Sequence, residues 1–443
     1  MNLARALRPL LGDILVVDGT RIFAVNVAGA GLAFLSHILF ARWLGVGSYG
    51  IYVFALSWLN VLLIAQQAGL NVSLVRFAAE LNASGDGAAL RRLMKFSNAV
   101  VTTLGAITLV GGAIALAILA RPANDELIAA LYVMLALSLL LALLQQRMAL
   151  LQGLERVFQS VLLFEIARPM LVLAVAGAAV IFWRLDAALL MAVNLVVTGV
   201  VLMVAIRFAT RCLPAASTAG SPAPAGWRHW LRTSLPYIAV TGLTILLTQM
   251  DVLMIGALLG PEQAGLYAPA AKVALLAIFP VVAIRQRFGP MAARLFAAGD
   301  MTALQSRMTL ATALSIAACV GVLAVILPGR DLILGLFGPA YTAGAPVVLV
   351  LAAGYLAYSV AGAAEMFFLV GPFERMNALV VLLTLGVNIL LNLLLIPRFG
   401  IVGAAYGTVA AVAFRAILSA AVVRHRTGLL PFAWRPGLRT TSS

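Results

Sequence analysis

Long apolar runs separated by short polar turns account for almost the whole chain. A helix needs about 20 apolar residues to cross the hydrocarbon core of a bilayer. The runs here exceed the ~10-residue alternating segments of an outer-membrane barrel, so we expect helical spans. The pattern predicts an all-α integral membrane protein of about twelve transmembrane helices, near residues 15–41, 48–70, 93–119, 127–148, 157–183, 187–209, 234–258, 263–289, 308–327, 341–370, 377–396 and 401–423.

The chain also contains an internal repeat. Residues 44–52 (Leu-Gly-Val-Gly-Ser-Tyr-Gly-Ile-Tyr) recur in part 215 positions later as residues 259–267 (Leu-Gly-Pro-Glu-Gln-Ala-Gly-Leu-Tyr). Residues 81–90 match residues 295–304 at an offset of 214, with Leu, Ala, Gly, Asp, Ala and Leu in register. Two independent matches at nearly one offset indicate a duplicated half. Six helices per half would insert both halves in the same orientation, as in transporters with two parallel repeats.

The repeat suggests where the halves join. Residues 211–226 are rich in Ala, Pro, Ser and Gly, a composition that cannot build a core and is typical of a tether. The predicted organisation is a six-helix lobe over residues 1–210, a cytoplasmic linker over 211–230, a second lobe over 231–424 and a cytoplasmic tail over 425–443.

Composition supports the membrane assignment. The 443 residues are 63% hydrophobic and 10% charged, whereas a soluble domain carries roughly 25% charged residues. The two cysteines, Cys212 and Cys319, imply no disulfide framework.

The net charge of +15 follows the topology. With the N-terminus in the cytoplasm, 21 Lys and Arg residues fall in inner segments and 5 in outer turns. This bias predicts a multi-pass protein with both termini in the cytoplasm. It also predicts contact with anionic lipid headgroups and no nucleic-acid partner.

Charged residues inside spans are the first candidates for a site, because a charge at the bilayer centre costs about 2.5–3.5 kcal/mol. Guanidinium and ammonium groups can hold an anionic group of a substrate, and intramembrane carboxylates can bind a coupling proton or cation. The candidate substrate-binding residues are Arg21, Arg168, Lys272, Arg285 and Arg415, and the candidate ion-coupling residues are Asp251, Glu365 and Glu165.

Some of these charges have a structural alternative. Asp18 and Arg21, and likewise Glu165 and Arg168, are three residues apart and would share a helix face, so each pair could simply neutralise itself. Arg285 near the end of its span could merely follow the charge bias. Asn388 and Asn392, one turn apart, are interpreted as a hydrogen-bonding pair between helices. The spacing of His, Cys, Asp and Glu predicts no metal site, and no cofactor is expected.

Four short motifs occur in order along the chain. The first is Ala-Arg-Trp-Leu-Gly at residues 41–45, before Gly50 and Tyr52, and the second is Asp-Val-Leu-Met-Ile-Gly at residues 251–256. The third and fourth lie at residues 336–346 and 392–405. Together they resemble polysaccharide (oligosaccharide) flippases, a family of the multidrug/oligosaccharidyl-lipid/polysaccharide exporter superfamily, over nearly the whole chain. The resemblance implies a V-shaped fold of two lobes.

The resemblance implies a transport function. It implies translocation of an undecaprenyl-pyrophosphate-linked oligosaccharide across the bacterial inner membrane by alternating access, for O-antigen lipopolysaccharide, capsule or exopolysaccharide. Other polysaccharide assembly proteins are implied as partners. It leaves open which glycan and which coupling ion are used.

Two other classes compete with this interpretation. A cation-coupled multidrug extruder of the same superfamily would need an acidic cavity for cationic amphiphiles. A membrane enzyme acting on the same lipid-linked sugar would need convergent acids or bases in a roomy aqueous site. The short outer turns favour a protein that is not an enzyme.

Overall fold

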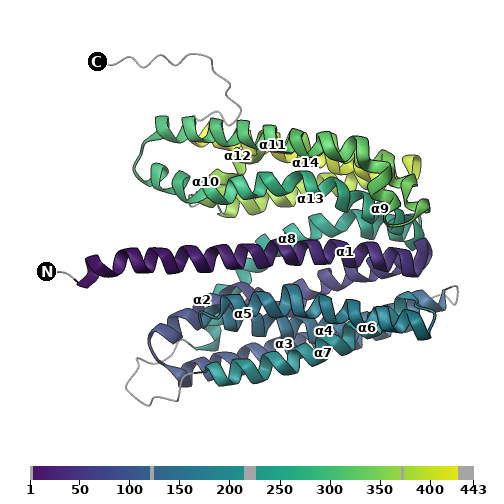
Figure 1. Cartoon of the computed structure of the whole chain (residues 1–443), viewed down its shortest axis with the longest axis horizontal. Helices are drawn as coiled ribbons and strands as arrows, with labels where there is room; N and C mark the ends of the chain where they lie inside the picture. Colours follow the sequence, from purple (N-terminus) through teal and green to yellow (C-terminus); the bar gives the residue numbers. More distant parts are fainter. Residues whose placement is uncertain (1–2, 120–123, 214–225, 371–373, 428–443) are drawn as a thin grey trace. The chain divides into compact units, whose positions relative to one another are not determined.

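Helices make up almost all of the computed structural model, which describes residues 3–119, 124–213, 226–370 and 374–427 (Figure 1). No strand occurs within these ranges. The chain forms two compact units, residues 1–242 and 243–443. Unit 1 contains α1 (Leu3–Gln67), α2 (Leu70–Ala83), α3 (Gly87–Leu119), α4 (Asp125–Gly153), α5 (Val157–Val161), the π-helical turn η1 (Leu162–Ala167), α6 (Arg168–Phe182) and α7 (Ala187–Cys212).

Helix α8 (Trp227–Leu258) starts in unit 1 and ends in unit 2. Unit 2 continues with α9 (Pro261–Leu275), the 3-10 turn η2 (Leu276–Ile278), α10 (Phe279–Ala297), α11 (Met301–Gly335), the 3-10 turn η3 (Pro339–Gly344), α12 (Ala345–Val370), α13 (Glu374–Phe399) and α14 (Ile401–Thr427).

The expected number of membrane crossings agrees with these helices. Eleven helical segments within the described ranges are long and apolar enough to span a bilayer. One of them, Ala24–Gln67, lies within α1. There Gly45 (φ 73°, ψ 176°) interrupts the helical backbone. Nδ1 of His37 lies 3.0 Å from the Tyr49 hydroxyl, although twelve residues of straight helix would separate them by about 18 Å. The chain therefore reverses at Gly45, and α1 supplies two of the twelve predicted spans.

The side chains on the outside of the helices also fit a bilayer. Ile181 and Leu332 are 77% and 76% exposed, and many other large aliphatic side chains are exposed as well. Lipid tails would cover such surfaces, so the molecule needs no larger core to hide them.

The internal repeat is visible in the local backbone geometry. Gly45 and Gly260 both have positive φ, 73° and 96°, at the first repeated turn. At the second, Gly85 (φ 70°) and Gly299 (φ 73°) each precede an aspartate that begins a helix. The carboxylate of Asp86 accepts from the Ala89 amide at 2.8 Å.

The later copy carries the same cap. The carboxylate of Asp300 accepts from the Ala303 amide at 2.9 Å. An aspartate at this position satisfies an otherwise unpaired amide of the first helical turn. The Gly-Asp dipeptides recur because both halves need the same left-handed turn followed by the same cap.

The first half of α8 packs within unit 1. The rings of Trp230 and Phe96 lie 5.5 Å apart, and the Ser234 hydroxyl is hydrogen-bonded to that of Ser73 on α2. Residues 214–225 of the expected linker lie outside the described residues. The proposed domain bounds and the orientation of the termini therefore stay predictions.

Candidate functional site

Asp251 lies at the centre of a polar cluster inside unit 2. Its Oδ2 accepts hydrogen bonds from the Tyr267 hydroxyl at 2.6 Å and from the Thr408 hydroxyl. Its Oδ1 accepts from the Nδ2 atoms of Asn392 at 2.9 Å and Asn388 at 3.3 Å. Four donors from α9, α13 and α14 thus converge on one carboxylate of α8.

Three members of this Asp251 cluster are buried within the unit, whereas Asp251 and Thr408 are half-buried. Asn392, Asn388 and Tyr267 are 0%, 1% and 2% exposed. An ionised carboxylate has about four lone-pair sites, and the four donors match that capacity. Besides the Asp251 carboxylate, the other members can also turn an oxygen toward a bound cation, since amides and hydroxyls both carry acceptors.

Arg168 occupies a comparable position inside unit 1. Its Nε donates to the Thr198 hydroxyl at 3.1 Å, and one terminal nitrogen lies 3.5 Å from Oδ1 of Asn194. Its guanidinium carbon lies 5.8 Å from the centre of the Phe164 ring. Tyr52 of α1 interacts with both Arg168 and Asn194. The arginine is thus held by hydrogen-bonding residues of its own unit.

The repeat relates these two clusters. Tyr52 and Tyr267 are 215 positions apart, and Asn194 and Thr408 are 214 positions apart. In each unit, a tyrosine and a polar residue at equivalent positions surround one charge. That charge is the cation Arg168 in unit 1 and the anion Asp251 in unit 2.

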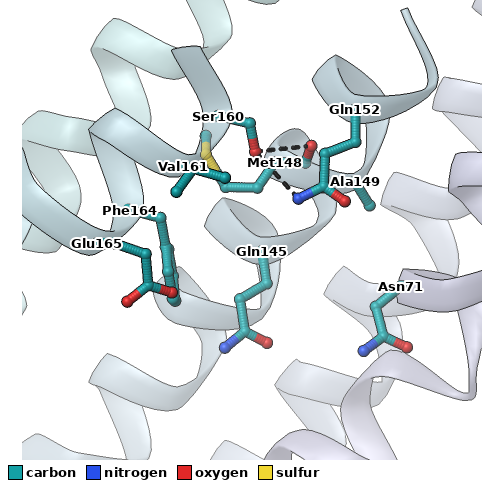
Figure 2. Close-up of a pocket in the computed structure, with 9 residues that line it drawn as sticks. All are labelled: Asn71, Gln145, Met148, Ala149, Gln152, Ser160, Val161, Phe164 and Glu165. Carbon is teal, nitrogen blue, oxygen red and sulfur yellow. Dashed lines mark hydrogen bonds between the residues drawn. The ribbon is translucent and has the colours of Figure 1, made fainter. Parts of the chain in front are cut away.

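Glu165 lines a cavity of about 260 Å³ inside unit 1 (Figure 2). Asn71 of α2, Gln145 and Gln152 of α4, and Phe164 of η1 lie around the same space. Gln145 accepts a hydrogen bond from the side chain of Gln67.

The remaining candidates are spread over several helices. Arg21 is exposed on α1, and Lys272 and Arg415 are partly buried on α9 and α14. Arg285 of α10 donates to the Tyr358 hydroxyl at 2.9 Å. The side chain of Glu365 lies outside the described residues. Within the described part of the chain, no group of three or more His, Cys, Asp or Glu residues could hold a metal ion.

Comparison with known families settles the class of protein. The profile of the polysaccharide biosynthesis protein family matches residues 15–296. The chain belongs to the polysaccharide biosynthesis protein family. No curated protein sequence matches it.

Solved structures show that the fold of this polysaccharide biosynthesis protein is that of membrane transporters. A multidrug-resistance MATE family transporter of the MOP superfamily, in an inward-facing conformation, has a TM-score of 0.73 at 15% identity. The match covers 92% of this chain and 97% of that one. The lipid II flippase MurJ, in an inward closed conformation, has a TM-score of 0.68 at 10% identity, covering 91% and 87%.

A third similar structure is a MOP superfamily transporter from Pyrococcus furiosus. It is described as having a binding pocket of reverse polarity, and it has a TM-score of 0.65 at 14% identity. The match covers 92% of this chain and 94% of that one.

The sequence pointed to Asp251 as a candidate but not to Tyr267 or Thr408. The prediction that Asn388 and Asn392 hydrogen-bond between helices is confirmed, since both amides of α13 donate to Asp251 of α8. The sequence carried one signal for the asparagines, because two amides one turn apart form a single polar face on α13.

Gly407 of α14 makes room for Asn392, which gives a test of the Asp251 cluster. A Cβ added at Gly407 would overlap Oδ1 of Asn392. We expect Gly407→Ala to push this amide off Asp251 and to lower transport several-fold. Gly386→Ala on α13 is the control, since a Cβ there meets nothing within 4 Å. Equal transport by both variants, measured at equal protein abundance, would show that the amide position is unimportant.

Proposed function

We propose that this protein moves an undecaprenyl-pyrophosphate-linked oligosaccharide across the inner membrane by alternating access, as a non-enzymatic flippase. Membership of the polysaccharide biosynthesis protein family supports the substrate class. The observation that carries the transport mechanism is Asp251, an intramembrane carboxylate surrounded by four donors.

Asp251 supplies the ion-coupling site in this proposal. A carboxylate buried in a membrane protein is costly unless it is hydrogen-bonded or binds a cation. A proton or monovalent cation at Asp251 replaces some of the hydrogen bonds from Tyr267, Thr408 and the two asparagines. Those bonds join four helices, so binding and release of the ion change how tightly α8 is held to α9, α13 and α14. That change couples the ion to the conformation of unit 2.

The pyrophosphate of the substrate requires cationic groups. Lys272, Arg285 and Arg415 supply them in unit 2, together with Arg21 and Arg168 in unit 1. Arg168 uses its Nε to donate to Thr198, and its charge remains available to attract the pyrophosphate. Glu365 and Glu165 complete the set of carboxylates proposed for coupling.

The alternative proposal is a cation-coupled multidrug extruder. Its support is the similarity in fold to a multidrug-resistance transporter, at a TM-score of 0.73.

Deletion of the gene in the native host distinguishes the two proposals. We expect loss of a surface polysaccharide and accumulation of its lipid-linked oligosaccharide in the inner membrane, with no change in sensitivity to cationic dyes. Complementation by the wild-type chain should reverse both effects. Unchanged polysaccharide together with increased dye sensitivity would instead support the extruder.

A further inference from the structure

Neutral hydrogen-bonding side chains form most of the polar lining of the cavity in unit 1. Asn71, Gln145, Gln152 and Ser160 face it, and Glu165 is the single carboxylate among its lining residues. An amide presents a donor and an acceptor side by side, and a hydroxyl presents both on one atom. This lining matches a ligand with many neighbouring hydroxyl groups, which also both donate and accept.

The charge around the cavity is nearly balanced. Glu165 interacts electrostatically with Arg168, three residues further along the chain. A phosphate or a cationic drug would need an excess of the opposite charge to offset its desolvation. The balance therefore favours an uncharged polar ligand.

An aromatic side chain adds a flat apolar wall. Phe164 lies with Glu165 on the π-helical turn Leu162–Ala167, and such turns are frequent at functional sites. Figure 2 shows the polar ends of Glu165, Gln145 and Asn71 pointing to one side, with the Phe164 ring beside Glu165. A sugar ring has the matching character, with apolar C–H groups on a face and hydroxyl groups around its edge.

The volume limits how much of a glycan the cavity can hold. The cavity volume of about 260 Å³ lies just below the ~300–1,000 Å³ typical of sites for drug-sized ligands. The cavity can therefore enclose about one sugar ring and is too small to enclose a whole oligosaccharide.

We propose that this cavity is a subsite for one sugar unit of the lipid-linked oligosaccharide, an inference that rests on the proposed function. The side-chain oxygen of Gln145 accepts from Gln67, so its NH₂ group donates to a sugar hydroxyl. Glu165 accepts from neighbouring hydroxyls, and the ring packs against Phe164. The subsite orients the glycan while the pyrophosphate binds elsewhere.

Binding of the free glycan tests the subsite. The probe is the host's own oligosaccharide, released from its lipid by mild acid and dephosphorylated, titrated into the full-length protein in detergent. We expect the wild type to bind it, and Gln145→Met and Glu165→Gln to bind it about tenfold more weakly, the effect of losing one good hydrogen bond. Gln305→Met on α11 and Glu262→Gln on α9 make the same exchanges away from the cavity and should bind normally.

The outcomes separate the subsite from the proposed function. Glu165→Gln keeps the size of the side chain, so it remains informative if Gln145→Met does not fold. Equal binding by the cavity variants overturns the subsite. So does absence of binding by a wild-type preparation that still transports the lipid-linked form, and in both cases the proposed function stands.

Cavity variants that lose binding of inorganic pyrophosphate or a cationic dye instead would assign the cavity to that ligand. A wild-type protein that neither transports the lipid-linked form nor binds the glycan contradicts both proposals.

Discussion

Asp251→Asn is expected to abolish coupled transport while the protein still folds. The amide keeps the size of the side chain but removes the charge, and it turns an NH₂ group toward donors that need an acceptor. Each interaction with a charged group contributes about 1.5–3 kcal/mol, and 1.4 kcal/mol is a factor of about ten. The amide offers the ion no charge, so loss of that interaction weakens ion binding by about ten- to 100-fold. Transport should be measured in cells and in vesicles at matched protein abundance.

Asp331→Asn provides the matched control for this prediction. Asp331 lies in the same unit on α11, its side chain is 60% exposed, and it is 3.7 Å from Arg330. An exposed pair of this kind contributes little to stability, so this variant should transport normally. Full transport by Asp251→Asn would remove Asp251 from the coupling mechanism.

Gly69→Ala is expected to cause the largest loss of stability. Gly69 precedes α2 with φ 73°, and an added Cβ would overlap the carbonyl oxygen of Ser234 on α8. The obstacle is backbone, so α2 and the first half of α8 must move apart. That movement would disrupt the Ser73–Ser234 hydrogen bond. We expect a sharp drop in thermal stability in detergent, or loss of the folded protein.

Gly85→Ala separates this steric effect from backbone strain. Gly85 has nearly the same φ, 70°, but a Cβ there meets nothing within 4 Å. It should therefore lose only the roughly 1–2 kcal/mol that a left-handed conformation costs an L-residue. Similar melting temperatures for the two variants would show that the approach of α8 to Gly69 does not matter for stability.

The global fold could be predicted because it depends on features that recur along the chain. Apolar length fixed the number of spans, and the repeated Gly-Asp dipeptides marked equivalent turns. Gly45 shows why a short motif is enough to predict a chain reversal. A glycine with positive φ between two apolar runs reverses the chain without help from distant residues.

The partners of Asp251 could not be predicted in the same way. Tyr267, Asn388 and Thr408 are 16, 137 and 157 residues away from it, and only the packing of α9, α13 and α14 brings them together. Glu165 and Arg168 show a second limit of prediction from the sequence. Their electrostatic interaction agrees with the expected pairing, but the π-helical turn at Leu162–Ala167 was not predicted. Arg168 donates to α7, and Glu165 lines a cavity.

Reconstituted translocation tests the central claim most directly. Purified protein is placed in vesicles that carry the host's undecaprenyl-pyrophosphate-linked oligosaccharide, and a lectin added outside measures glycan exposure over time. The account predicts that wild-type protein moves the glycan between leaflets much faster than protein-free vesicles do, and that Asp251→Asn does not. Wild-type vesicles that expose the glycan no faster than protein-free vesicles would contradict it.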